Sequence, residues 1–189
     1  MTNEVVLDIE TQTAIGEVAR EDLRVSVVVA YFYNEDKYES YLENDLPRLF
    51  KQLEGASRII GYNSVGFDIP ILNKYYAGDL LNISQLDMLD KIYQALGFRL
   101  KLDAVAAATT GAGKSAHGLT AVQWWKEGRV QDVIDYCQQD VKVTKEVYEF
   151  GRDNGFLLFD DRMGERRKVE VDFGAPDDQK SAINLTMGF

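Results

Sequence analysis

The sequence predicts an α/β fold: a mixed sheet, made from a strand meander and then a helix-strand unit, flanked by helices and followed by a C-terminal β-hairpin. Three observations indicate this class. Apolar, β-branched segments alternate with turn residues near the N-terminus, apolar residues recur at helical spacing through the middle, and two alternating segments follow. With 189 residues, 46% of them hydrophobic, the chain can bury one sizeable core. We expect a single domain over residues 1–174 and a tail over residues 175–189.

The first third of the chain contains the expected sheet strands. Residues 5–11, VVLDIET, and residues 23–33, LRVSVVVAYFY, are rich in β-branched and aromatic residues, and the second segment is too apolar for an exposed edge. A turn at 34–36 and a short strand at 37–42 complete a meander. Leu46, Leu49, Phe50 and Leu53 then have helical spacing, Pro47 fits the first turn, and residues 58–62 return to the sheet.

The remainder reads as mostly helical. A helix is expected to begin at Asp68 and to include Tyr75 and Tyr76, and residues 80–152 look almost wholly helical, with segments at 88–96, 102–109, 119–126 and 130–151. After Gly155, residues 156–159 and 167–173 alternate and predict a hairpin whose turn is rich in basic residues.

Composition limits the functional classes. The net charge of −10 argues against a broad basic surface that coats nucleic acid, although it does not exclude an enzyme that binds one strand end. The sequence shows no signal peptide and no apolar run long enough to span a membrane, so we expect a soluble, cytoplasmic protein that does not associate with membranes. The single cysteine, Cys137, cannot form an intrachain disulfide.

Four acids stand where packing alone would not place charge. Asp8 and Glu10 are two residues apart in the first strand and therefore face the same side, which points either to a divalent metal between them or to a solvated edge strand. Asp68 precedes an apolar run and could cap a helix. Asp140 lies at the border of the apolar stripe of the long helix, and Tyr136 lies one turn before it.

A glycine-rich segment raises a second possibility. Residues 108–115, ATTGAGKS, satisfy a relaxed phosphate-loop pattern. We reject nucleotide triphosphate binding because a helix, not a buried strand, is expected before the loop. A flexible interhelical loop is the simplest interpretation, and Lys114 and His117 remain candidates for contacts with substrate phosphates.

Taken together, these acids resemble the motifs of the DEDD superfamily of 3′ to 5′ exonucleases, in the branch with tyrosine in its third motif. The first motif resembles residues 8–11, DIET. The second resembles residues 61–63 with residues 67–70, GYN and FDIP, close to the form in proofreading domains of family B DNA polymerases. The third resembles residues 136–140, YCQQD. The resemblance covers roughly residues 4–151 and implies a ribonuclease H-like fold.

The resemblance also implies a chemistry. Two divalent cations, Mg²⁺ or Mn²⁺, would be held by Asp8, Glu10, Asp68 and Asp140, with Asp8 bridging both, Glu10 and Asp140 completing the first site and Asp68 holding the second. Such ion pairs activate water and stabilise the leaving oxygen in phosphodiester hydrolysis. Tyr136 would orient the water, and the product would be a nucleoside 5′-monophosphate. We add Thr11, Asn63 and Phe67 as candidate substrate contacts, with Phe67 able to stack on a base.

The substrate and the partners stay open at this stage. The expected ligand is a nucleic acid 3′ end, with single-stranded DNA favoured over RNA because of the second motif. An RNA exonuclease and a catalytically silent ribonuclease H-like binding module are the alternatives. The sequence does not say whether the domain works alone or beside a polymerase or helicase on another chain, and it leaves the oligomeric state open.

Overall fold

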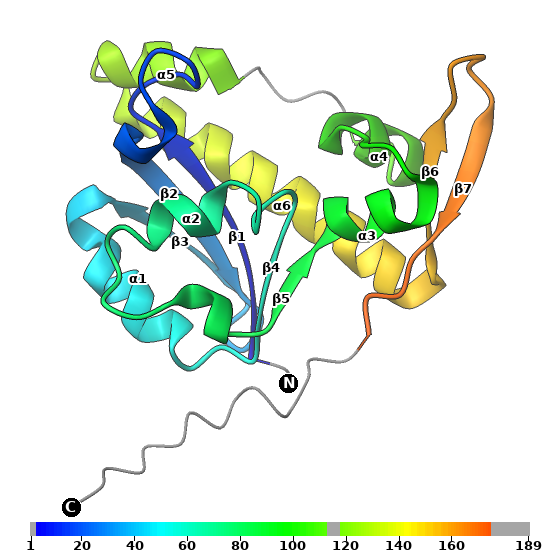
Figure 1. Cartoon of the computed structure of the whole chain (residues 1–189), viewed down its shortest axis with the longest axis horizontal. Coiled ribbons are helices and arrows are strands. Elements are labelled where there is room, and N and C mark those ends of the chain that lie inside the picture. Colours follow the sequence, from blue (N-terminus) through cyan, green and yellow to red (C-terminus); the bar gives the residue numbers. More distant parts are fainter. Residues whose placement is uncertain (1–2, 113–117, 175–189) are drawn as a thin grey trace, which may run out of the picture.

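A five-stranded sheet forms the centre of the molecule in the computed structural model, which describes residues 3–112 and 118–174 (Figure 1). Its strand order is β3-β2-β1-β4-β5. β1 pairs antiparallel with β2, and β2 with β3, whereas the β1–β4 and β4–β5 pairs are parallel. The expected mixed sheet, built from a meander and a helix-strand unit, is therefore confirmed.

The bounds of the elements are as follows. The strands are β1 (Glu4–Thr11), β2 (Val25–Phe32), β3 (Lys37–Leu42), β4 (Arg58–Gly61), β5 (Gln85–Asp87), β6 (Phe156–Asp160) and β7 (Arg166–Glu170). The α-helices are α1 (Leu46–Leu53), α2 (Asp68–Leu72), α3 (Met88–Leu96), α4 (Leu102–Thr109), α5 (Gly118–Lys126) and α6 (Val130–Asn154). Short 3-10 turns cover Arg20–Asp22, Glu43–Asp45 and Leu80–Asn82.

Strand alternation divides the core into two layers. Val5, Leu7 and Ile9 of β1 pack with α1 and α2 on one face of the sheet. Val6 belongs to the layer on the other face, where α6 crosses the sheet (Figure 1). Because side chains alternate along a strand, Asp8 and Glu10 lie on the α6 face with Val6. The fold thus directs both acids of β1 toward the long helix.

The expected element bounds agree with the structure to within about three residues over most of the chain, with two larger differences. The segment after residue 80 is not almost wholly helical, because Gln85–Asp87 form β5 at the sheet edge. A strand of three residues is too short to show alternation, so its pattern merges with the following helix. The helix that begins at Asp68 ends at Leu72, and Tyr75 and Tyr76 lie beyond it.

The C-terminal hairpin is present as expected, and it is tied to the sheet by a buried arginine. β6 pairs with β7, and the hairpin packs beside α4 at one end of the molecule (Figure 1). Arg58 of β4 is 4% exposed; its guanidinium forms an ion pair with Glu4 and donates to the carbonyl oxygens of Phe173 and Gly174. Breaking such a buried pair typically costs about 3–5 kcal/mol, so this network anchors the chain after β7.

Within the described residues, no helix combines the length and the apolar character needed to cross a membrane.

Candidate metal centre and cleft

The two acids of the first strand lie in the part of β1 that no longer pairs with its parallel neighbour β4. The β1–β4 ladder ends at the Val6–Ile60 pair, while β1 continues beside β2 as far as Thr11. Asp8 and Glu10 therefore stand beyond the carboxyl end of β4, at the sheet edge where α/β folds commonly place ligand sites. Both side chains are half-buried.

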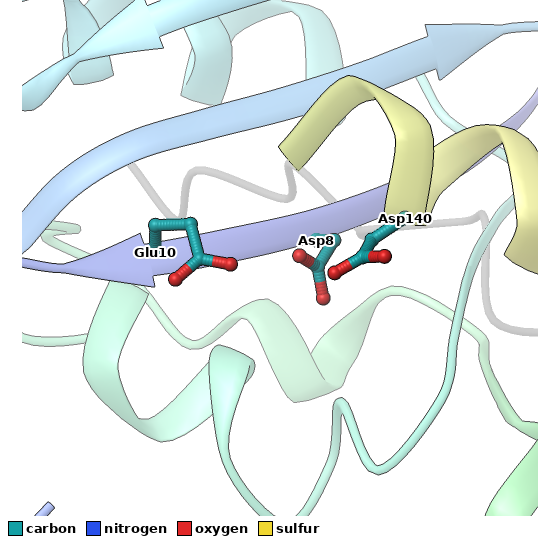
Figure 2. A group of neighbouring side chains, drawn as sticks. All are labelled: Asp8, Glu10 and Asp140. Carbon is teal, nitrogen blue, oxygen red and sulfur yellow. The ribbon is translucent and has the colours of Figure 1, made fainter. Parts of the chain in front are cut away.

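α6 brings a third carboxylate to the same place. Asp8, Glu10 and Asp140 each offer one oxygen atom, and these three oxygens all lie within 4.8 Å of one another. Figure 2 shows the Asp140 side chain descending from α6 toward Asp8, with Glu10 farther along β1. Residues from opposite parts of the sequence thus form one acidic triad, which we define as Asp8, Glu10 and Asp140.

Asp68 lies beside the acidic triad but is not a member of it. It is the first residue of α2 and is 4% exposed. Its Oδ1 atom accepts a hydrogen bond of 3.1 Å from the backbone N–H of Ile9, in the part of β1 that no longer pairs with β4. Asp68 therefore satisfies a strand donor rather than capping its own helix, and its carboxylate remains next to Asp8.

The loop that carries Asp68 is held by another buried acid, Asp87. The Asp87 carboxylate accepts hydrogen bonds from the backbone N–H groups of Asn63 (2.7 Å) and Val65 (3.0 Å), and it also caps α3. Asn63 has a φ of +65°, a conformation that asparagine tolerates better than most residues. Gly61 has no space for a side chain, because a Cβ atom there would lie 2.5 Å from the Cβ of Ser64. Asp87 thus positions the loop over residues 61–67.

The carboxylates perturb one another strongly. Burial raises the pKa of Asp8 well above its usual value, and the neighbouring carboxylates of Asp68, Glu10 and Asp140 raise it further. Burial is also the main cause that raises the pKa of Glu10 to about 8, with Asp140 and Asp68 adding to it. The pKa of Asp68 rises to about 7, again mainly through burial, although hydrogen bonds from backbone N–H groups oppose the shift. No cation among the described residues offsets these shifts for Asp8, Glu10 or Asp68.

Comparison with known proteins gives this geometry a family. A sequence profile of the RNase H superfamily matches residues 5–150, which include every residue of the acidic triad and Asp68. The chain belongs to the RNase H superfamily. No curated protein matches the sequence. Among solved structures, the family B DNA polymerase from the hyperthermophilic archaeon Pyrobaculum calidifontis is similar, with a TM-score of 0.64 and 18% identity. That match covers 78% of this chain and 24% of the polymerase chain, so it supports the fold alone.

The acidic triad of this RNase H superfamily member suits a hard divalent cation. Carboxylate oxygens are the ligands that Mg²⁺ and related cations prefer. In the described part of the chain, no lysine or arginine nitrogen lies within 4 Å of the Asp8 or Glu10 carboxylates. A divalent ion would supply the positive charge that Asp8 and Glu10 do not find among the described residues, so the acidic triad fits such an ion.

A cleft of about 360 Å³ opens at the acidic triad. Asp68 and the candidate substrate contacts Thr11, Asn63 and Phe67 also line it, together with Ile15 and Tyr62. The structure therefore places three of the five expected substrate contacts beside the acids. The other two, Lys114 and His117, lie outside the described residues. The helix α4 directly before the glycine-rich segment agrees with rejection of a phosphate loop there.

Tyr136 and Cys137 approach the acidic triad from α6. The Tyr136 ring packs edge-on against Trp124, with 6.4 Å between ring centroids, and it is half-buried. Burial raises the pKa of Tyr136, and the carboxylates of Asp140 and Glu10 raise it further, so its hydroxyl keeps its proton at neutral pH. The buried Cys137 thiol lies 3.4 Å from the Asp8 carbonyl oxygen and 3.6 Å from Asp8 Oδ2. A hydrogen bond from this thiol opposes the rise in the pKa of Asp8, although burial and the neighbouring carboxylates outweigh it.

Proposed function

We propose that this chain is a metal-dependent 3′ to 5′ exonuclease of the tyrosine-containing DEDD branch, which hydrolyses terminal phosphodiester bonds and releases nucleoside 5′-monophosphates. The observation that carries the proposal is the acidic triad, in which three carboxylates from β1 and α6 meet in an open cleft, with no basic partner for Asp8 or Glu10 among the residues that the structure describes. Structural carboxylates normally have a cation or several donors nearby. Membership of the RNase H superfamily supports a nuclease.

The residues divide into those that hold metal and those that hold substrate. Asp8 would contact both of two Mg²⁺ or Mn²⁺ ions, Glu10 and Asp140 would complete one site, and Asp68 would serve the other from the start of α2. Bound divalent ions supply Lewis-acid stabilisation of charge on the attacking and leaving oxygens. Thr11, Asn63 and Phe67 line the cleft where the terminal nucleotide would sit. The Phe67 ring offers a face on which a base can stack.

Tyr136 orients the attacking water in this proposal and does not act as its base. A hydroxyl whose pKa is raised retains its proton and can donate a hydrogen bond. The substrate is expected to be single-stranded DNA rather than RNA, on the strength of the second motif. We further propose one domain over residues 1–174, in a cytoplasmic protein that acts on a nucleic acid end.

The direct test is digestion of 5′-labelled DNA and RNA oligonucleotides with Mn²⁺ present. We expect a ladder that shortens from the 3′ end, faster with single-stranded DNA than with RNA, and nucleoside 5′-monophosphates as products. Oligonucleotides with a blocked 3′ end are the control and should resist digestion. Internal cleavage, or no cleavage of any substrate, would contradict the proposal, and faster loss of RNA would correct its sugar preference.

The variant Tyr136→Phe should keep measurable activity. Loss of one water-orienting hydroxyl is expected to reduce kcat by about 10- to 100-fold, which is less than the loss of a metal ligand. The rise in Tm on addition of Mn²⁺ should match that of the unmodified protein, because the phenol is not placed among the ligands. Complete loss of turnover, or a weaker Mn²⁺ response, would assign Tyr136 a different role.

A further inference from the structure

A second cleft, of about 440 Å³, adjoins the cleft at the acidic triad. Ile15, Asn63 and Phe67 line both clefts, so the two are continuous. Its remaining lining comes mainly from the loop after β1 and from the segment after α3. We call it the arginine cleft, because Arg20 and Arg99 lie on its walls.

The arginine cleft combines apolar surface with two cations. Phe67 and Ile15 supply the apolar surface, and Ile15 is 75% exposed. Arg20 lies over the Phe67 ring, 5.8 Å from its centroid, and donates to the Gly66 carbonyl oxygen. Arg99 donates to Asn63 Oδ1. The loop around Phe67 therefore fixes the direction of both guanidinium groups.

Both arginines are free of carboxylate partners within the part of the chain that the structure describes. The other arginines there, apart from Arg162, each form an ion pair with a carboxylate (Arg24, Arg48, Arg58, Arg129, Arg152, Arg166 and Arg167). A guanidinium has five N–H donors, and the hydrogen bonds just described use one from Arg20 and one from Arg99. In a chain with a net charge of −10, two unpaired arginines on one cleft mark a site for an anion.

We propose that the arginine cleft binds the nucleotide that precedes the 3′-terminal one, with Arg20 and Arg99 contacting its backbone phosphate. The inference rests on the proposed function and names how the same site holds its strand. The only phosphate of the 3′-terminal nucleotide is the one that is cut at the acidic triad. The next phosphate along the strand belongs to the preceding nucleotide, and the arginines of the adjoining cleft are the cations available to bind it. Planar guanidinium groups bind phosphate through two parallel hydrogen bonds.

The test compares two substrates that differ only beyond the scissile phosphate. The p-nitrophenyl ester of thymidine 5′-monophosphate has one nucleotide, and its leaving group carries no phosphate for Arg20 and Arg99 to contact, whereas a DNA strand of ten nucleotides supplies that phosphate. We expect Arg20→Gln and Arg99→Gln each to lower the ratio of kcat/KM for the strand to that for the ester by about tenfold. The matched control is Arg162→Gln, which removes an exposed arginine of the hairpin turn and should leave the ratio as it is.

Binding gives a readout that does not require turnover. Fluorescence anisotropy of a labelled DNA strand of ten nucleotides, with Ca²⁺ present, should show weaker binding by both cleft variants. The slope of log Kd against the logarithm of the salt concentration should decrease by about 0.7 for each arginine removed. Equal loss on strand and ester, or unchanged affinity and salt dependence, would overturn the inference. If the unmodified protein cleaves neither substrate, the proposed function fails, and the anisotropy of the variants then decides the arginine cleft by itself.

Discussion

Asp8→Asn is expected to abolish turnover and to raise the stability of the metal-free protein. The amide has nearly the shape of the carboxylate but cannot hold two cations, and loss of metal-borne charge stabilisation should lower kcat by at least about 10³-fold. The same change removes the charge that three neighbouring carboxylates oppose. In EDTA at pH 8, Tm should therefore rise, by about 5 °C for a relief of roughly 2 kcal/mol.

The opposite signs of these two effects separate an active site from a structural acid. A carboxylate that stabilises the fold would lower Tm when it is neutralised. Glu170→Gln is the control, because Glu170 is an exposed acid on β7, outside the residues that line the cleft. It should change neither kcat nor Tm appreciably. Full activity of Asp8→Asn, or of the more drastic Asp8→Ala, would refute the assignment.

Strand periodicity explains why part of the site could be predicted from the sequence. Two acids at positions i and i+2 of an apolar strand must share a face, so Asp8 and Glu10 required no tertiary information. Asp140 was visible as an acid at the border of the apolar stripe of α6. The approach of Asp140 to Asp8 depends on how α6 crosses the sheet. Periodicity does not predict this crossing, whereas the resemblance to a known family implies that the two acids meet.

The residues that sequence reasoning missed are those whose position depends on loops. Asp87 ends a strand of three residues inside a stretch that reads as helical, although an aspartate directly before Met88 is a recognisable helix cap. Arg20 and Arg99 lie in segments without a period. They meet only because the loop after β1 and the segment after α3 both reach the loop that Asp87 holds.

The pKa values of the cleft predict how metal and pH together control stability. A carboxyl group with a raised pKa in the folded state binds its proton more tightly there than in the unfolded chain. Stability from this source is therefore complete below the unfolded value of about 4.5 for Glu10 and is lost as the pH rises through its folded value of about 8. Asp68, with a folded pKa of about 7, adds to the same loss. The groups that face Glu10 and Asp68 include no base in the described cleft (Asp8, Asp87, Asp140, Tyr136 and Cys137).

We therefore expect Tm in EDTA to fall between pH 5 and pH 8.5, and millimolar Mn²⁺ to restore it most strongly at the upper end of that range. A metal ion that binds only the folded state stabilises it by RT ln(1 + [L]/Kd), or about 2.7 kcal/mol at a hundredfold excess over Kd. The effect is smaller at low pH, because protons compete with the metal for the same carboxylate oxygens. Calorimetry across this range gives both curves. Glu10→Gln is the matched control, because it should flatten the EDTA curve and weaken the Mn²⁺ response together. Two results would contradict the metal site: equal Tm values for Glu10→Gln and the unmodified protein in EDTA above pH 7, or no effect of Mn²⁺ on Tm at pH 8.5. Either would mean that the acidic triad does not carry the uncompensated charge on which a metal site depends.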